Sequence, residues 1–387
     1  MSRPKICIIQ YNSSRFLTRV DRSARTLAEA GYEVVLIAIK DAETDAFEDR
    51  GDYVVKRVTL ASRRLPARFG LRVLRFIEAV FKTFWAAYRE RADIYDARDA
   101  EPLLVAHLAA RLRRAKLVYD SDELNLDRNK PFCRKRWWRF LMKRFEGFYA
   151  RRADAVITTD HGRADVLVER YRIPRPVVVL NVPDVSAELE PDPDFRTRAL
   201  GDRRYLLIYQ GVLIENRGIP EMMRAMPLLP ECRLALVGYG HKEAEYRAIA
   251  RDEGLTDGVV FFDAVPFEQL MRYTAAADIG MIPLIPAVLS YVYAAPNKLF
   301  EYMMAGLPVV VSDLPDMAKV VAEERIGTLI ADPTSPESIA HAVRRLIEGN
   351  ESLTDIGARA RAAALARYNW AFEKATLLET YRSIAES

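Results

Sequence analysis

Short apolar runs rich in β-branched residues alternate along most of this sequence with longer segments of helical periodicity. The alternation predicts βα units, in which a helix connects each strand to the next parallel strand of the same sheet. The expected strands of the first half are residues 5–10, 32–40, 54–60, 93–97, 116–120, 155–159 and 177–181. Those of the second half are residues 205–211, 232–238, 259–263, 279–284, 308–313 and 327–332. We therefore expect an α/β protein with doubly wound, Rossmann-like parallel sheets.

The length of 387 residues exceeds what one hydrophobic core usually serves, so two domains are expected. Residues 182–203 carry three prolines and many carboxylates with little apolar content, which predicts an interdomain linker. The domains are then residues 1–181 and 204–365, followed by a terminal helix, 366–387, that we expect to pack back on the first domain. Two doubly wound domains facing each other form a cleft, and ligands bind beyond the carboxyl ends of their strands.

The formal net charge of +4 conceals a strong asymmetry along the chain. Residues 1–180 hold 37 basic and 24 acidic side chains, whereas residues 181–387 hold 21 and 30. The two halves therefore have different electrostatic roles. The hydrophobic share of 50% excludes disordered and collagen-like proteins.

Three scattered cysteines, Cys7, Cys133 and Cys232, lack metal-ligand spacing and indicate a reducing compartment. The short apolar run at residues 6–9 is typical of a strand and not of a signal peptide. No stretch approaches the roughly 18 apolar residues of a spanning helix. We expect a cytoplasmic protein, or one attached peripherally to the inner face of the cytoplasmic membrane.

A dinucleotide-binding site is not supported. The loop at residues 10–14 has no glycine, and the loop with Gly238 and Gly240 has Glu243 where a third glycine belongs. The two glycines suit either a tight strand-to-helix turn or the approach of a phosphate or sugar to the backbone. Both interpretations stay open.

The most informative stretch is residues 295–313. Pro296 is suited to opening a helix, and Lys298 and Glu301 then lie three residues apart on one face. A cation and a carboxylate at a helix N-terminus suit a ligand that carries a diphosphate and vicinal hydroxyls. The competing interpretation is an ordinary surface ion pair.

This run, from Pro296 to Val310, resembles the nucleotide-binding helix of the retaining glycosyltransferases of family 4, which reads P-x-K-x-x-E-x-M-A-x-G-x-P-V-V. Similar segments follow the family order over nearly the whole chain. They are Gln210-Gly211 with Arg217-Gly218, which resembles the opening of the donor domain, and residues 93–99, 118–124 and 21–34, which resemble parts of the acceptor domain.

The resemblance implies the GT-B fold, with residues 1–181 binding the acceptor and residues 204–365 binding the donor. It implies transfer of a sugar from a UDP- or GDP-sugar to a glycan or lipid-linked acceptor, with retention of configuration. Cell-surface polysaccharides such as capsule or lipopolysaccharide are the expected products. No cofactor, metal or nucleic acid is expected, because the fold uses Lys and Arg to stabilise the leaving diphosphate.

The residues expected to act are grouped by the part of the reaction they serve. For catalysis we expect Asp99, Asp122 and Glu123. For the donor we expect Gly211, Arg217, Gly238, Gly240, Asn297, Lys298 and Glu301. For the acceptor or membrane side we expect Asn12, Arg98, His161, Trp137 and Trp138.

The chain departs from the family pattern at several positions. Tyr293 stands where the first Glu of the E-x7-E motif belongs, and Val212 where many members have Arg. Asp122 replaces the His of a D-x-H-E segment. These departures favour a second hypothesis, a nucleotide-sugar-binding or scaffold protein without catalysis.

Asp120-Ser121-Asp122 is also a D-x-D sequence, which binds Mg²⁺ or Mn²⁺ in the other large glycosyltransferase fold. The family 4 resemblance aligns the same residues with D-x-H-E and therefore favours the metal-independent interpretation.

Basic and aromatic residues are interleaved at residues 63–91 and 128–152. The second segment holds ten basic residues and one acid, Glu146. The pattern suits solvated helices, single-stranded nucleic acid or an anionic membrane. A lipid-linked acceptor favours the membrane, with attachment through Trp137 and Trp138.

Overall fold

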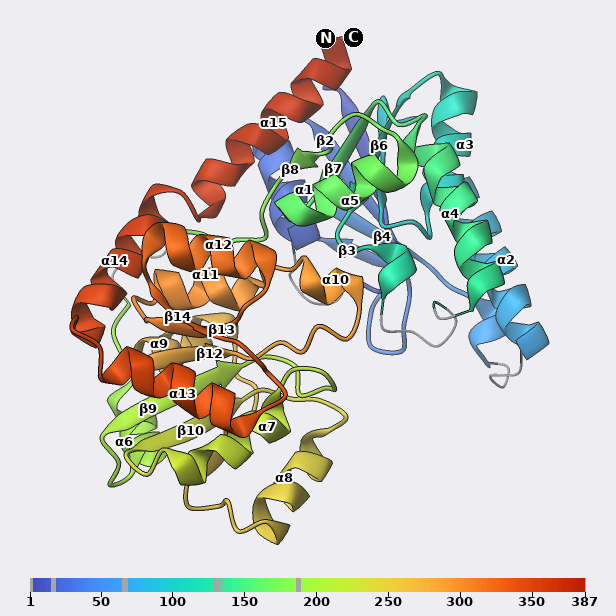
Figure 1. The fold of residues 1–387 in the computed structure, drawn as a ribbon. Coiled ribbons are helices and arrows are strands. Elements are labelled where there is room, and N and C mark those ends of the chain that lie inside the picture. Colours follow the sequence, from blue (N-terminus) through green and yellow to red (C-terminus); the bar gives the residue numbers. More distant parts are fainter. Residues whose placement is uncertain are drawn as a thin grey trace. The chain divides into compact units, whose positions relative to one another are not determined.

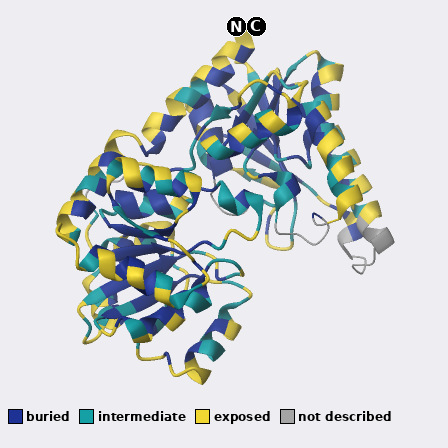
Figure 2. Cartoon of the chain, in the orientation of Figure 1, coloured by how far each residue is buried: buried dark blue, intermediate teal, exposed yellow. Residues whose placement is uncertain are grey.

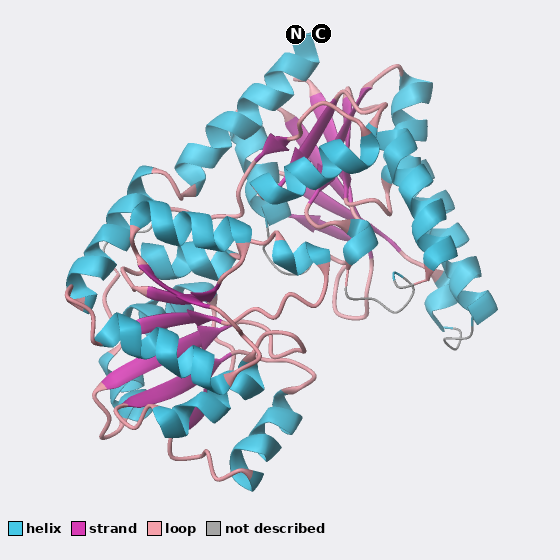
Figure 3. Cartoon of the chain, in the orientation of Figure 1, coloured by secondary structure: helices cyan, strands magenta, loops and turns pink. Residues whose placement is uncertain are grey.

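The computed structural model describes residues 3–14, 19–64, 69–128, 133, 135–185 and 189–386. The chain divides into two compact units (Figure 1). The first unit comprises Met1–Leu180 and Lys374–Ser387, and the second comprises Asn181–Glu373. Each unit contains one sheet with helices packed against it (Figure 3).

The first unit is built on an eight-stranded sheet in the order β3-β4-β2-β1-β5-β6-β7-β8. All neighbours are parallel except β3 and β4. The strands are β1 (Lys5–Ile9), β2 (Glu33–Ile39), β3 (Phe47–Asp49), β4 (Val54–Val58), β5 (Ile94–Arg98), β6 (Lys116–Ser121), β7 (Ala155–Thr158) and β8 (Val177–Val178). The short edge strand β3 is absent from the sequence prediction, because three half-exposed or exposed residues carry no periodic signal.

Helices connect these strands: α1 (Arg19–Glu29), α2 (Phe69–Arg89), α3 (Leu103–Arg113), α4 (Arg136–Ala150) and α5 (His161–Tyr171). The strand order runs outward from β1 on one side and from β5 on the other. Because crossover connections are right-handed, this reversal places helices on both faces of the sheet. The central strands are accordingly buried between the helices (Figure 2). In β1, Ile6, Ile8 and Ile9 are fully buried.

The second unit holds a six-stranded parallel sheet in the order β11-β10-β9-β12-β13-β14. Its strands are β9 (Tyr205–Gln210), β10 (Cys232–Val237), β11 (Val259–Phe262), β12 (Ile279–Ile282), β13 (Val309–Ser312) and β14 (Gly327–Ile330). Its helices are α6 (Pro193–Leu200), α7 (Ile219–Ala225), α8 (Glu243–Asp252), α9 (Phe267–Ala275), α10 (Leu289–Val292), α11 (Asn297–Met304), α12 (Pro315–Glu324), α13 (Pro336–Ile347) and α14 (Leu353–Ala366). The order again reverses, here between β9 and β12.

The segment predicted as a linker, 182–203, contains the helix α6 and belongs to the second unit. The Asp192 side chain caps this helix by accepting a hydrogen bond from the Phe195 backbone N–H at 2.8 Å. The buried Phe195 ring stacks on Tyr273 with centroids 4.1 Å apart. Packing of the buried Phe195 ring therefore stabilises a helix in a segment whose composition predicts a linker.

The last helix, α15 (Trp370–Glu386), begins in the second unit and continues into the first from Lys374 onward. Leu377, Tyr381 and Ile384 are buried there. The Tyr381 hydroxyl donates a hydrogen bond to Asp96 at 2.7 Å. None of the described helices combines the length and the apolar character needed to cross a bilayer.

Candidate functional site

In each sheet the crevice for a ligand is expected where the strand order reverses, beyond the carboxyl ends of the strands. In the second unit this point lies between β9 and β12. Gly211 directly follows β9, and α11 lies between β12 and β13 in the chain. The predicted donor residues therefore gather at the reversal of the second sheet.

Lys298 lies beside the end of β9. Its Nζ is 3.9 Å from the centroid of the Tyr209 ring. A Cβ at Gly211, where φ is +125°, would lie 3.3 Å from the same Nζ. Gly211 thus leaves room for the lysine and adopts a backbone conformation that suits glycine.

Arg217 is the second cation of this group, and its guanidinium carbon lies 4.9 Å from the centroid of the Tyr291 ring. Burial and the Arg217 charge lower the pKa of Lys298 to about 7, although Glu301 acts in the opposite direction. Among the described residues, neither Arg217 nor Lys298 forms an ion pair with a carboxylate within 4.0 Å. Two cations without such a partner are suited to binding an anion.

Glu301 is held by Gln210 and Thr274, neither of which is among the expected site residues. Its Oε2 accepts a hydrogen bond from Gln210 Nε2 at 2.5 Å. The Oε1 atom of Gln210 accepts in turn from the Thr274 hydroxyl at 2.5 Å. These two hydrogen bonds, from α9 to the end of β9 and on to Glu301, orient the carboxylate. No local motif predicts them, because the three residues are distant in sequence. Asn297 is exposed at the first position of α11.

Gly238 and Gly240 lie in the loop after β10, packed against the loop after β9. A Cβ at Gly238 would lie 1.9 Å from the Gly211 carbonyl oxygen, and one at Gly240 would lie 2.1 Å from that of Leu213. Both positions therefore require glycine for loop packing alone. This favours the tight-turn interpretation of the two glycines without excluding backbone contact with a ligand.

In the first unit the strand order reverses between β1 and β5. Asp99 directly follows β5 and has a φ of +69°. Its Oδ2 lies 2.6 Å from a guanidinium nitrogen of Arg128, which also pairs with Glu101 at 2.8 Å and Glu123 at 2.9 Å. Burial raises the pKa of Asp99 to about 8, against the opposing effect of Arg128. Arg128 was not among the expected site residues.

Asp122 interacts electrostatically with Asp99 and pairs with the buried Arg19. Burial raises its pKa, and Arg19 Nε lies 3.3 Å from its Oδ1. About 31% of the Asp122 side chain is exposed, so its carboxylate remains accessible at the strand end. The mutual Coulomb repulsion of Asp99 and Asp122 further raises the pKa of Asp99.

Arg98 is placed differently from the expectation. It is almost fully buried and pairs with Asp96 at 2.9 Å and with Asp120 at 2.5 Å. Direct contact with an acceptor is therefore not supported for Arg98, because its charge is satisfied inside the sheet. Asp120 is also engaged by Arg19 at 3.3 Å, which leaves it unsuited to the metal binding considered for the D-x-D sequence. Within the described part of the chain, no group of three or more His, Cys, Asp or Glu side chains could hold a metal ion.

The other predicted acceptor-side residues lie at different places in the first unit. Asn12 is exposed after β1 and accepts a hydrogen bond from the Ser14 backbone N–H at 2.9 Å. His161 is exposed at the start of α5. Trp137 and Trp138 are on α4, where Trp137 is exposed and Trp138 is half-buried. The two tryptophans are thus not equivalent, because only the first is fully available to a partner.

Two family models match the chain, one on each half. The model of the glycosyl transferases group 1 matches residues 192–363, and that of the glycosyl transferase 4-like domain matches residues 17–183. The chain belongs to the GT4-type glycosyltransferases.

Curated relatives agree with this assignment. A GDP-mannose-dependent alpha-(1-6)-phosphatidylinositol monomannoside mannosyltransferase of Mycolicibacterium smegmatis is 30% identical over 49% of this chain and 52% of the relative. The amylovoran biosynthesis glycosyltransferase AmsK of Erwinia amylovora is 27% identical over 41% and 39%. The lipopolysaccharide glucosyltransferase WaaG of Escherichia coli is 28% identical over 38% of each chain. The chain thus spans about half or less of the length of these relatives.

Solved structures agree with the GT-B fold of the glycosyltransferase. Sucrose-phosphate synthase from Thermosynechococcus elongatus superposes with a TM-score of 0.80 at 20% identity, covering 100% of both chains. Anabaena HepE in complex with UDP-glucose gives a TM-score of 0.73 at 17% identity, covering 98% of this chain and 99% of HepE. At these identities the likeness concerns the fold alone.

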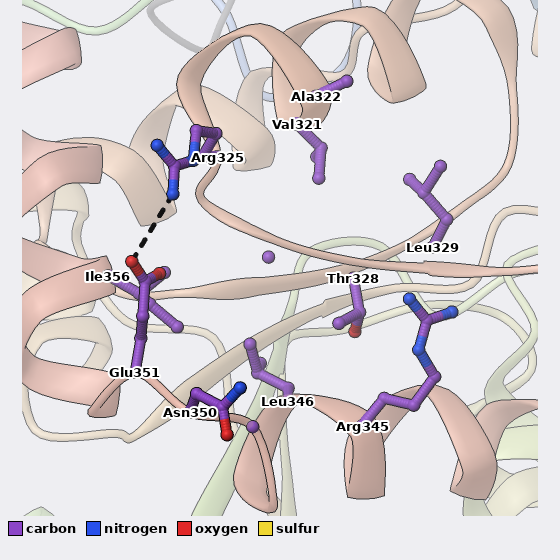
Figure 4. A pocket seen from close by; sticks show the side chains of 12 residues that line it. Val321, Ala322, Arg325, Thr328, Leu329, Arg345, Leu346, Asn350, Glu351 and Ile356 are labelled. Carbon is purple, nitrogen blue, oxygen red and sulfur yellow. Dashed lines mark ion pairs between the residues drawn. The ribbon is translucent and has the colours of Figure 1, made fainter.

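A separate pocket, with a volume of about 450 Å³, lies on the second unit (Figure 4). Val321, Thr328 and Leu346 line it, and Arg325 pairs with Glu351 at 3.7 Å beside it. It lies at the amino end of β14, whereas Gly211 follows the carboxyl end of β9. Because all strands of this sheet are parallel, the pocket lies at the edge opposite the donor residues.

Proposed function

We propose that this glycosyltransferase transfers a sugar from a UDP- or GDP-linked donor to a glycan or lipid-linked acceptor in cell-surface polysaccharide biosynthesis, with retention of configuration. The observation that carries the proposal is the pair of cations, Arg217 and Lys298, at the reversal of the second sheet beside Glu301. The departing nucleoside diphosphate develops negative charge during transfer. Fixed cations stabilise that charge best when they are already in place.

Each donor residue then has a role that follows from its chemistry. Lys298 and Arg217 bind the diphosphate, together with the free N–H groups at the start of α11 beside Asn297. Glu301, oriented by Gln210, accepts hydrogen bonds from the ribose hydroxyls.

On the acceptor side, Asp99 and Asp122 are the two candidates for taking the proton of the acceptor hydroxyl. General-base assistance of this kind is worth roughly 10²- to 10⁴-fold in rate. Asp99 has its pKa raised to about 8 and a fixed partner in Arg128. Asp122 is the more exposed of the two side chains. Glu123, paired with Arg128, helps to hold this arginine in place.

The names of the relatives support the substrate classes. HepE is described in complex with UDP-glucose, and the mycolicibacterial relative is GDP-mannose-dependent. The relatives act in phosphatidylinositol mannoside, amylovoran and lipopolysaccharide synthesis. These names favour a nucleotide-sugar donor and an acceptor that is a glycan or is attached to a lipid.

Titration of UDP-, GDP- and dTDP-sugars by calorimetry tests the donor site. We expect Glu301→Ala and Lys298→Ala each to weaken binding by roughly 10- to 100-fold, because each removes a charged hydrogen-bonding group. Lys319→Ala is the matched control, since Lys319 is 60% exposed on α12 of the same unit. Unchanged nucleotide affinity in Glu301→Ala would show that the site assignment is wrong.

The second candidate function is nucleotide-sugar binding without turnover, which Tyr293 favours because it removes a carboxylate of the motif. Transfer assays with lipid-linked and soluble glycans separate the two, and NMR of the product establishes the anomeric configuration. Binding without turnover across several acceptors would favour the second candidate. Activity that a chelator abolishes and manganese restores would overturn the metal-independent mechanism.

A further inference from the structure

Exposed apolar side chains are concentrated on three helices of the first unit. Of the nineteen large hydrophobic side chains that are exposed among the described residues, twelve lie on α2, α3 and α4. On α4 the exposed fractions reach 59% for Trp137 and 60% for Phe140. Figure 2 shows the exposed residues along α2 and α4. Single exposed apolar residues are ordinary, but a concentration of this kind indicates a binding surface.

Helix α4 exposes large apolar side chains beside its basic ones, unlike a helix that only faces water. Trp137, Phe140, Leu141 and Phe148 repeat at helical spacing and are exposed. Glu146, in contrast, is fully buried and accepts a hydrogen bond from the Tyr119 hydroxyl at 2.6 Å. The helix therefore directs an apolar stripe outward and its only carboxylate inward.

The helix α2 repeats this arrangement. Leu74, Ile77, Phe81 and Trp85 follow one another at intervals of three or four residues, and all are exposed. Residues at these intervals lie on one face of a helix. A groove of about 520 Å³ beside this stripe is lined by Phe81, Trp85 and Arg89 among others. The groove combines aromatic rings with a cation.

Direct contacts join the three helices into one surface. The Arg113 guanidinium of α3 lies 3.8 Å from the ring of Tyr88 on α2 and donates to the Tyr88 carbonyl oxygen at 2.9 Å. The His107 ring of α3 lies 5.1 Å from the ring of Tyr149 on α4. We call the exposed side of α2, α3 and α4 the three-helix face.

The charge on the three-helix face has a single sign. Every exposed charged side chain described on these helices is basic: Arg89, Arg111, Arg136, Lys143 and Arg144. The acid of α2, Glu78, is half-buried and pairs with Lys82 at 2.7 Å. The face is therefore cationic as well as apolar.

We propose that the three-helix face docks on an anionic lipid bilayer, with its apolar side chains at the boundary between headgroups and acyl chains. Aromatic and aliphatic side chains fit this boundary, and Arg and Lys reach the lipid phosphates. A second copy of the chain is disfavoured, because like charges would oppose each other across the contact. Nucleic acid is disfavoured by the aliphatic side chains such as Leu74 and Ile77, which provide no ring for base stacking.

The proposal goes beyond the transfer reaction and is tested without it. Full-length protein is sedimented with vesicles of phosphatidylcholine alone or mixed with phosphatidylglycerol, at low and high salt. We expect binding to the anionic vesicles, weaker binding at high salt, and little binding to phosphatidylcholine alone. Equal binding to both vesicle types at low salt would overturn the electrostatic part of the proposal.

Variants locate the contact. We expect the double variant Trp137→Ala, Phe140→Ala to bind anionic vesicles at least tenfold more weakly than the unchanged protein. Adding Lys143→Glu and Arg144→Glu should weaken this binding further, since each lost surface charge is worth roughly fivefold in affinity. The double variant Phe267→Ala, Phe372→Ala is the matched control, because both rings are exposed in the second unit. Thermal unfolding of every variant should match that of the unchanged protein, since the substituted side chains are exposed.

Three results would overturn the proposal. They are equal vesicle binding by the face and control variants, a dimer in light scattering that only the face variants lose, and tighter binding to single-stranded nucleic acid than to anionic vesicles. Transfer to a water-soluble acceptor should be unchanged in the double variant Lys143→Glu, Arg144→Glu, because both residues are exposed and neither belongs to the expected donor or acceptor groups. A failure of membrane docking is thereby distinguished from a failure of the proposed reaction.

Discussion

At the residue scale, charged side chains are buried in opposite pairs where the first sheet ends. Four charged side chains there are each at most 3% exposed and lie within 3.3 Å of an opposite charge: Arg19, Asp96, Arg98 and Asp120. Removing one partner of a buried pair leaves an unpaired charge, which typically destabilises a protein by about 3–5 kcal/mol. These residues therefore stabilise the strand ends that carry Asp99 and Asp122.

The lowered pKa of Lys298 predicts that nucleotide-sugar affinity falls as the pH rises above about 7. In the free protein this pKa is lowered to about 7, so the amine loses its charge above that pH. A bound diphosphate stabilises the charged form, so binding takes up a proton, and affinity should fall by up to about tenfold per pH unit. Calorimetry with a UDP-sugar from pH 6 to 9 measures the effect. Lys298→Arg should flatten the dependence, and a flat profile in the unchanged protein would contradict the prediction.

The raised pKa of Asp99 predicts a pH-dependent rate if this carboxylate is the base. Because its pKa is raised to about 8, Asp99 is largely protonated at pH 7, and the transfer rate should rise with pH until about 8. Asp122, Glu101 and Glu123 raise this pKa and Arg128 lowers it, so Arg128→Gln should move the rise to higher pH. The measurement is kcat against pH with saturating donor.

Substitution of the two candidate carboxylates identifies the base. Asp99→Asn should lower kcat by roughly 10²- to 10⁴-fold and remove the rise near pH 8. Asp122→Asn is the matched comparison, and the same loss there with an unchanged Asp99→Asn variant would assign the role to Asp122.

At the element scale, helix α6 shows how tertiary contacts decide what a polar segment becomes. Its neighbours in sequence are prolines and carboxylates, yet Phe195 packs against Tyr273 and Phe262, with ring centroids 4.1 and 4.8 Å away. Most of the stability of a short helix in a protein comes from such packing.

Phe195→Ala should therefore lower the free energy of unfolding by about 3–5 kcal/mol, the usual effect of removing a fully buried ring. Urea unfolding followed by circular dichroism measures the change. Phe267→Ala, at a ring 52% exposed on α9, is the control and should change it by less than about 0.5 kcal/mol. Equal effects of the two variants would show that α6 is not anchored as described.

At the scale of the whole molecule, helix α15 ties the end of the chain to the sheet of its first half. The hydrogen bond from Tyr381 to Asp96 joins residues 285 positions apart. Both side chains are fully buried. The first unit is therefore complete only when the last residues of the chain are in place.

Tyr381→Phe should destabilise the protein by about 1–3 kcal/mol, because it removes a hydrogen bond from a buried carboxylate. Thermal unfolding measures the change, with Tyr239→Phe as the control at a ring 55% exposed. Nucleotide affinity should be retained, since Tyr381 belongs to the first unit. If Tyr381→Phe unfolded at the same temperature as the control, the hydroxyl would have no structural role.

Features encoded in neighbouring residues were predictable from the sequence alone. The alternation of strand and helix periods predicts both parallel sheets, since periodicity is a local property. Lys298 and Glu301 were found because three residues of helix bring them to one face. The resemblance to the family rests on the same run of residues.

Only the tertiary structure decided which distant side chains meet. Three contacts depend on the order of strands in a sheet, which no local pattern predicts. They join Arg128 to Asp99, Gln210 to Glu301 and Tyr381 to Asp96. The tertiary structure also decided that α4 exposes Trp137, Phe140 and Phe148, because an amphipathic pattern defines two faces of a helix without saying which of them meets the core.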